Sequence, residues 1–223
     1  MSEWWTYSLS DFLLFSPRTY YRLFALYNDA VWPAHIATAA LGALCLALAR
    51  RGGALGTRAV LTVLAALWLW IAWAFHAERF VAINWAAIYY AYAFTLQAAL
   101  LLWVALVRPP DGTRAASSPI AFAVALFAIL LQPAIGSLFG RDWHQAEVFG
   151  LSPDPTALAT LALLAMQARP PWLLIIFPAL WCVMTGLTLW TMQAPDALLT
   201  PIAGALALLA GAWKTAPHED SRH

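Results

Sequence analysis

Three short polar stretches contain the residues whose types and spacing could do chemistry. The first joins two apolar runs and holds His76, Glu78, Arg79 and Asn84. A neutral imidazole near a membrane surface could bind a metal ion or relay protons. The alternative is a plain structural role, in which His76 bonds to a helix end and Glu78 pairs with Arg79 at the surface.

The second stretch runs from Arg141 to Glu147, and His144 stands three residues before Glu147. Residues at this spacing share a face if the segment is helical. Together with His76 and Glu78 they offer the nitrogen and oxygen ligands that Zn²⁺ accepts. Because such spacings are common by chance, His76, His144 and Glu147 are weak metal candidates. The cofactor is unknown, and none is expected.

The third stretch, Gly150 to Thr156, leads into a short apolar run. Asp154 is predicted as a helix N-cap, with Pro155 at the first helical position. A helix this short barely crosses a bilayer, so we expect it to start below the outer surface. Its free N–H groups could there face an anionic part of a solute. Capping by Asp154 alone would also explain the motif.

The amino-acid composition indicates the kind of fold, and the solvent around it, in which these residues are held. Of 223 residues, 63% are hydrophobic and 10% are charged, whereas soluble domains are about half apolar and about a quarter charged. A soluble core of this size could not bury so much apolar surface. We therefore expect a lipid bilayer as the solvent. The formal net charge of +1 gives no electrostatic basis for nucleic-acid binding.

Successive apolar runs predict the fold. A crossing of about 30 Å needs roughly 20 helical residues, and these runs are too continuously apolar for barrel strands. We predict an all-α integral membrane helical bundle of about seven transmembrane helices. The fifth helix is short and the seventh contains a proline. The predicted spans are 30–49, 58–77, 83–107, 118–139, 155–168, 171–190 and 196–213.

An amphipathic interfacial helix is predicted before the first span. Ser16-Pro17 is typical of a helix start, and apolar residues then recur at helical spacing opposite Arg18 and Arg22. Such a helix lies in the membrane surface. We accordingly divide the chain into an N-terminal interfacial segment (1–29), a seven-helix transmembrane domain (30–213) and a disordered cytoplasmic tail (214–223).

The basic residues predict orientation, because cytoplasmic loops carry an excess of arginine and lysine. One side collects Arg50, Arg51, Arg58, Arg108, Arg114, Arg169, Lys214 and Arg222, and the other Arg18, Arg22, Arg79 and Arg141. The abundance of arginine over lysine, with much alanine and leucine, indicates a GC-rich bacterial genome. We predict a bacterial inner-membrane protein with a periplasmic N-terminus and a cytoplasmic C-terminus.

Polar side chains gather in the outer half of this topology. Because such groups are costly inside a bilayer, they mark functional sites. The residues predicted to bind a ligand, in a cavity open to the periplasm, are His76, Asn84, Gln132, Asp154 and Thr156. The alternative is that several are helix-end groups reaching water. Catalytic residues are not identified, since the sequence has no phosphate-binding glycine loop, His-Glu-x-x-His or Gly-x-Ser-x-Gly.

Several segments resemble a family of small bacterial polytopic membrane proteins of unknown function. The resemblance covers about Leu13 to Ala212 and implies a fold but no activity. The segments that carry it are Tyr27 to Pro33, His76 with Phe80 to Ala87 and Gln97, Phe149 to Thr156, Pro171 to Leu174, and Pro195-Asp196.

Three functions stay open. The first is a small-solute transporter or binder using the outer cavity. The second is a membrane enzyme or redox accessory with His35, His76 or His144 on a metal or haem, although the sequence leans away from an enzyme. The third is a helper subunit whose small-residue face packs on partner membrane subunits, the face being Ala203, Gly204, Ala207 and Gly211.

Overall fold

The computed structural model describes residues 15–107, 118–167 and 171–215, which form helices and connecting turns with no strand. The all-α prediction is confirmed. The main helices are α1 (Pro17–Val31), α2 (Ala34–Arg51), α3 (Ala54–Trp70), α4 (Ala87–Val107), α5 (Pro119–Leu126), α6 (Gln132–Leu138), α7 (Pro153–Ala165), α8 (Leu173–Thr191) and α9 (Leu199–Thr215). Short π and 3-10 segments join them at η3 (Ile71–Ala77), η4 (Phe80–Ala82), η5 (Phe127–Leu131) and η6 (Trp143–Gln145).

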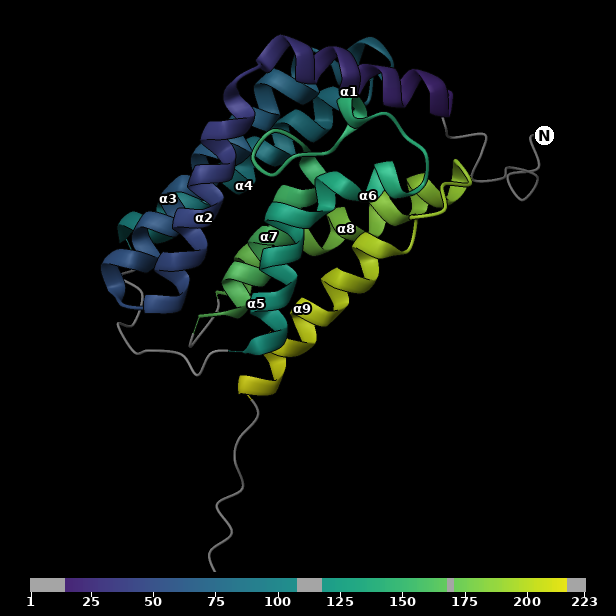
Figure 1. Ribbon diagram of the computed structural model, residues 1–223. Coiled ribbons are helices and arrows are strands. Elements are labelled where there is room, and N and C mark those ends of the chain that lie inside the picture. Colours follow the sequence, from purple (N-terminus) through teal and green to yellow (C-terminus); the bar gives the residue numbers. More distant parts are fainter. Residues whose placement is uncertain (1–14, 108–117, 168–170, 216–223) are drawn as a thin grey trace, which may run out of the picture.

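The predicted interfacial helix is α1, which lies across one end of the bundle (Figure 1). Ser16 caps it, its hydroxyl accepting a bond from the Thr19 amide at 3.2 Å. The axes of α1 and α2 meet at 91°. The apolar stripe that was predicted to lie in the membrane surface is instead buried inside the fold, as Tyr20, Leu23, Phe24 and Tyr27. The amphipathic pattern thus identified the buried face of α1 but not that protein covers it. Residues 1–14 of the predicted segment lie outside the described residues.

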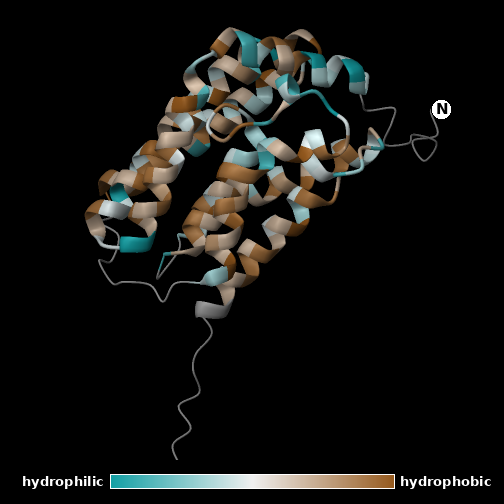
Figure 2. Cartoon of the chain, in the orientation of Figure 1, coloured by the Kyte–Doolittle hydropathy of each residue, from teal (hydrophilic) through white to brown (hydrophobic). Residues whose placement is uncertain are grey.

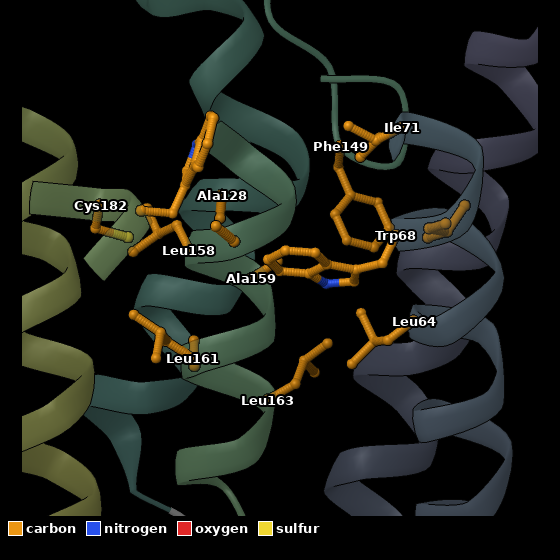
Figure 3. Packing of buried hydrophobic residues seen from close by; sticks show 14 of the residues in the cluster. Leu64, Trp68, Ile71, Ala128, Phe149, Leu158, Ala159, Leu161, Leu163 and Cys182 are labelled. Carbon is orange, nitrogen blue, oxygen red and sulfur yellow. The ribbon is translucent and has the colours of Figure 1, made fainter. Parts of the chain in front are cut away.

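The centre of the bundle is α7, whose thirteen residues are all buried. It packs against α3, α5, α8 and α9. Figure 3 shows the Trp68 ring of α3 beside Ala159 and Leu163 of α7. The indole nitrogen of Trp68 donates to the hydroxyl of Thr160 at 2.9 Å. Protein therefore surrounds α7 on every side.

The seven predicted spans correspond to α2, α3 with η3, α4, α5 through α6, α7, α8 and α9, but the predicted number of crossings is too high. Four helices are long and apolar enough to cross a membrane, or up to five if the bent pair α1 and α2 is one span. The physical reason is clearest at α7: thirteen residues reach about 20 Å, less than the hydrocarbon thickness.

Hydropathy along the fold separates the ends of the bundle from its middle (Figure 2). Hydrophilic residues gather on α1, on the loop beneath it and at the turn between α2 and α3, whereas apolar residues dominate the helices between. Large apolar side chains such as Leu55, Leu106 and Leu209 are exposed. This distribution is compatible with a bilayer around the bundle. The tail predicted for 214–223 falls largely outside the described residues, and α9 itself continues to Thr215.

Gly150 provides a test of this packing, with Gly140 as its matched control. Both have a positive φ, +79° and +80°. A β-carbon at Gly150 would lie 3.0 Å from side-chain carbons of Thr38 and Leu67, whereas Gly140 has nothing within 4 Å. Both alanine variants meet the left-handed penalty of about 1–2 kcal/mol. Gly150→Ala should lose about 1–3 kcal/mol more.

Chemical unfolding in mild detergent measures this difference. Equal losses of unfolding free energy in the two variants would mean that Gly150 does not approach α2 and α3 as closely as described.

Candidate functional site

Asp154 brings a carboxyl group into the enclosed centre of the fold. Its side chain is 3% exposed. One oxygen, Oδ1, accepts bonds from the Trp181 indole at 2.7 Å and the Thr185 hydroxyl at 2.8 Å, both on α8. The predicted N-cap role is wrong, because α7 begins at Pro153 with Ser152 at the cap. The carboxylate is instead a link from the first turn of α7 to α8.

Glu147 lies next to Asp154, so the two carboxyl groups form a pair that can share one proton. Glu147 is half-buried; desolvation, followed by the negative charge of Asp154, raises its pKa above the usual value. The second Asp154 oxygen, Oδ2, is buried and has no hydrogen-bond donor among the described residues. A protonated Glu147 is the neighbouring group that can supply one. Two adjacent carboxyl groups in this setting favour holding one proton between them.

Arg141 balances part of this negative charge. Its guanidinium forms an ion pair with Asp196 and lies 4.7 Å from the centroid of the Tyr21 ring on α1. Gly136 makes room for it, since a β-carbon there would lie 2.8 Å from the Arg141 Nε. One cation thus faces two carboxyl groups, those of Glu147 and Asp196.

A cavity of about 20 Å³ lies at this acidic pocket, which we define as Gln132, Arg141, Glu147, Asp196 and Thr200 around the cavity, with Asp154 beside Glu147. This volume holds about one water molecule. The Gln132 Oε1 and Asp196 Oδ1 atoms are buried, and no described residue forms a hydrogen bond with either. The pocket therefore contains unused acceptors and space for a single small donor.

His76 sits apart from water in an aromatic cage. Its ring centroid lies 4.5 Å from that of Phe94 and 5.3 Å from that of Trp181. Phe75, Phe80 and Tyr90 complete the cage, and neither ring nitrogen has a hydrogen-bond partner in the described part of the chain. Trp181 touches both His76 and Asp154, so these two predicted site residues are connected through one indole.

The other predicted residues divide between the pocket and local turns. Gln132 lines the acidic pocket. The side-chain oxygen of Asn84 accepts a hydrogen bond from the Ala86 amide at 3.1 Å. The Thr156 hydroxyl donates a hydrogen bond to the Ser152 carbonyl and accepts one from the Gly150 amide, both at 2.8 Å. Asn84 and Thr156 thus have local structural partners.

The three metal candidates are not brought together. His76 lies in its aromatic cage, His144 contacts Asp29 with its Nδ1 3.0 Å from Oδ1, and Glu147 adjoins Asp154. Within residues 15–107, 118–167 and 171–215, no group of three or more His, Cys, Asp or Glu side chains is arranged to hold a metal ion.

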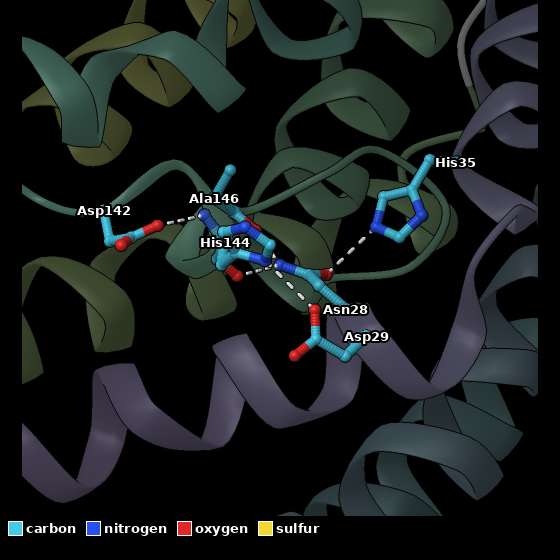
Figure 4. A network of polar contacts seen from close by, with 6 residues as sticks. All are labelled: Asn28, Asp29, His35, Asp142, His144 and Ala146. Atoms are coloured by element: carbon cyan, nitrogen blue, oxygen red, sulfur yellow. Dashed lines mark hydrogen bonds and ion pairs between the residues drawn. The ribbon is translucent and has the colours of Figure 1, made fainter.

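A second, larger opening lies next to the acidic pocket, and none of the five predicted ligand-binding residues lines it. This polar groove, of about 580 Å³, is lined by Asn28, Asp29, Trp32, His35, Ala39, Ile129, Leu130, Pro133, Trp143, His144, Ala146 and Val148. Figure 4 shows its polar network. The Asn28 amide donates to the carbonyls of His144 at 2.7 Å and Ala146 at 2.9 Å, while its oxygen contacts the His35 ring at 3.2 Å.

Only a weak sequence signal pointed to this groove. Asn28 and Asp29 lie in the last turn of an amphipathic helix just before Trp32-Pro33, and His35 is the second residue of the next helix. The loop partners of Asn28 and Asp29 are more than a hundred residues further along the chain. Local spacing could therefore not reveal the network.

The segment from His144 to Val148 separates the polar groove from the acidic pocket. His144, Ala146 and Val148 line the groove, whereas Gln145, Ala146 and Glu147 line the pocket. The backbone is extended at Ala146, and side chains of an extended segment alternate between two sides. A single layer of chain thus stands between the two openings.

Replacing Glu147 tests the protonated pair. A carboxyl group with a raised pKa adds stability at low pH, and that contribution is lost as pH rises through the raised value. The wild-type protein should therefore lose unfolding free energy on going from acidic to alkaline pH, by up to about 1.4 kcal/mol per pH unit. Glu147→Gln should flatten this dependence.

Unfolding temperatures recorded over a pH series in detergent measure the effect. Glu78→Gln, which changes an exposed glutamate, is the matched control and should follow the wild type. A Glu147→Gln profile parallel to wild type would show that Glu147 is not held protonated.

Comparisons with known proteins give a family but no activity. Residues 18–220 match a family of unknown function, DUF6064. No curated protein and no solved structure matches the chain. The match spans most of the sequence and agrees with the resemblance to a family of unknown function seen in its segments. The chain belongs to the DUF6064 family.

Proposed function

We propose that this protein is a bacterial inner-membrane protein that binds a small solute from the periplasmic side and couples binding or transport to a proton. The observation that carries the proposal is the wall from His144 to Val148 between the polar groove and the acidic pocket. In this proposal the solute occupies the groove and the proton occupies the Glu147–Asp154 pair.

The size and lining of the groove support solute binding. Its volume of about 580 Å³ lies within the range of small-molecule sites, which combine apolar walls with a few polar groups. Trp32 and Leu130 provide apolar surface, while Asp29, His35 and His144 provide polar groups. This combination suits a small amphipathic solute.

The coupling follows from the position of Glu147 in the wall. Loss of its proton would leave two adjacent carboxylates, which repel each other in a buried site. Ala146, the next residue, lines both openings, and its carbonyl is held by the Asn28 amide. A displacement of Glu147 would therefore also move Ala146, its neighbour in the chain, which lines the polar groove. A ligand can shift such an equilibrium when it binds the two arrangements unequally.

The helper-subunit alternative loses its supporting feature. Gly204 lies against Cys182 of α8, with 3.3 Å from an added β-carbon to the Cys182 Cβ, and Gly211 lies against Ala165. Ala207 is fully buried. The small-residue face of α9 is thus occupied inside the bundle, and no observation favours this function over solute binding.

Isothermal titration calorimetry in two buffers tests the coupling. Amphipathic amines, amino acids and carboxylates are first screened by thermal shift, with Trp32→Ala as the variant that should weaken a true hit, because Trp32 lines the groove. The heat of binding of a hit is then compared in phosphate and Tris, whose ionisation enthalpies differ. We expect wild type and Glu78→Gln to exchange protons on binding, and Glu147→Gln to bind without exchange.

Two outcomes would contradict the proposal. A proton count unchanged by Glu147→Gln would separate binding from the carboxyl pair. Hits that bind equally well to Trp32→Ala would place the solute outside the polar groove.

A further inference from the structure

A second groove, distinct from the polar groove and the acidic pocket, lies between α1 and the turn that follows η3. We call it the arginine groove. It has a volume of about 440 Å³ and is lined by Arg18, Thr19, Arg22, Leu23, Leu26, Glu78, Arg79, Ala82 and Ile83. Three arginines, one glutamate and several apolar residues therefore share one opening, and nothing in the proposed solute site uses them.

The arginines leave positive charge available. Arg18 and Arg22 are exposed and stand four residues apart, so they share one face of α1. Within the part of the chain that the structure describes, neither forms an ion pair with a carboxylate. Three guanidinium groups face one carboxylate, that of Glu78, which gives the groove a net positive charge.

Arg79 is the fixed member of the three. Its Nη1 donates to the Ala74 carbonyl at 2.6 Å, and its guanidinium lies 4.9 Å from the centroid of the Tyr27 ring. These contacts hold a cation at the wall of the groove. Arginine presents several donors in a planar fork, a geometry that matches phosphate oxygens.

The apolar part of the groove runs beside these charges. Leu26 is 57% exposed, and Ala82 and Ile83 lie on the opposite wall. Because α1 crosses the end of the bundle at 91° to α2, the arginines lie at the end where a membrane surface would meet the protein. The apolar stripe of α1 packs inside the fold, so the surface left for an acyl chain is the exposed Leu26 with Ala82 and Ile83, while the arginines would lie at headgroup level.

We propose that the arginine groove binds an anionic phospholipid, with the headgroup phosphate at Arg18, Arg22 and Arg79 and an acyl chain along Leu26 and Ile83. The proposal rests on membrane insertion and is independent of solute binding and proton coupling. An anionic lipid held here would fix α1 against the bundle and hence the roof of the polar groove, because Asn28 and Asp29 belong to the same helix.

Native mass spectrometry of the full chain in an uncharged maltoside detergent tests the proposal. The probes are dioleoyl phosphatidylglycerol, dioleoyl phosphatidylcholine and soluble glycerol 3-phosphate. We expect phosphatidylglycerol to bind wild type more tightly than phosphatidylcholine, and the double variant Arg18→Gln/Arg22→Gln to lose roughly 30-fold of its affinity for phosphatidylglycerol.

Two further variants keep the result interpretable. Arg51→Gln, at the other end of α2, removes an exposed arginine outside the groove and should bind as wild type does. Arg18→Lys/Arg22→Lys retains the charge and should recover part of the affinity, which separates loss of a binding charge from loss of folding.

Equal binding of the two lipids by wild type, or equal loss in Arg51→Gln and in the double variant, would overturn the proposal. Glycerol 3-phosphate competing at the same concentration as the lipid would make the site one for a free phosphate ester. Carbonate extraction of cell membranes is the separate measurement of insertion: a chain that stays in the membrane but shows no lipid preference refutes the lipid site alone.

Discussion

A helix enclosed by protein on all sides places a strict demand on every polar group that it carries. Helix α7 meets this demand along its apolar length by packing, and at its first turn by hydrogen bonding. Asp154 has two donors from α8 for one oxygen and none, among the described residues, for the other. Since an unpaired buried carboxylate oxygen is costly, the neighbouring Glu147 has a physical reason to keep its proton.

The elements around α7 supply the contacts that its buried polar groups need. Trp181 can donate to Asp154 because its ring is held in the aromatic cage shared with His76. Glu147 can adjoin Asp154 because the extended segment before α7 turns its side chain inward while His144 faces the polar groove. Asn28 of α1 fixes that segment from above. Any movement of the Glu147–Asp154 pair therefore takes place close to α1 and to the polar groove.

Much of the fold follows from local sequence, and the site does not. Ser16-Pro17 and the stripe on α1 predicted a helix and its buried face, and the apolar runs predicted the positions of the long helices. The run at α7 was assigned to lipid because apolar composition alone does not distinguish a helix surrounded by lipid from one surrounded by protein. Asp154 was assigned as an N-cap because spacing does not reveal Trp181 and Thr185. The contacts of Asn28 and Asp29 with the loop beyond α6 depend on the assembled bundle.

The most direct test of this account is the protonation state of Glu147 at neutral pH. Infrared spectroscopy of the full protein in H₂O and D₂O reports the carbonyl stretch of a protonated carboxylic acid, which shifts when the proton is exchanged. The account predicts such a band in wild type and in Glu78→Gln, and its loss in Glu147→Gln. Absence of the band from the wild-type protein at neutral pH would contradict the central claim.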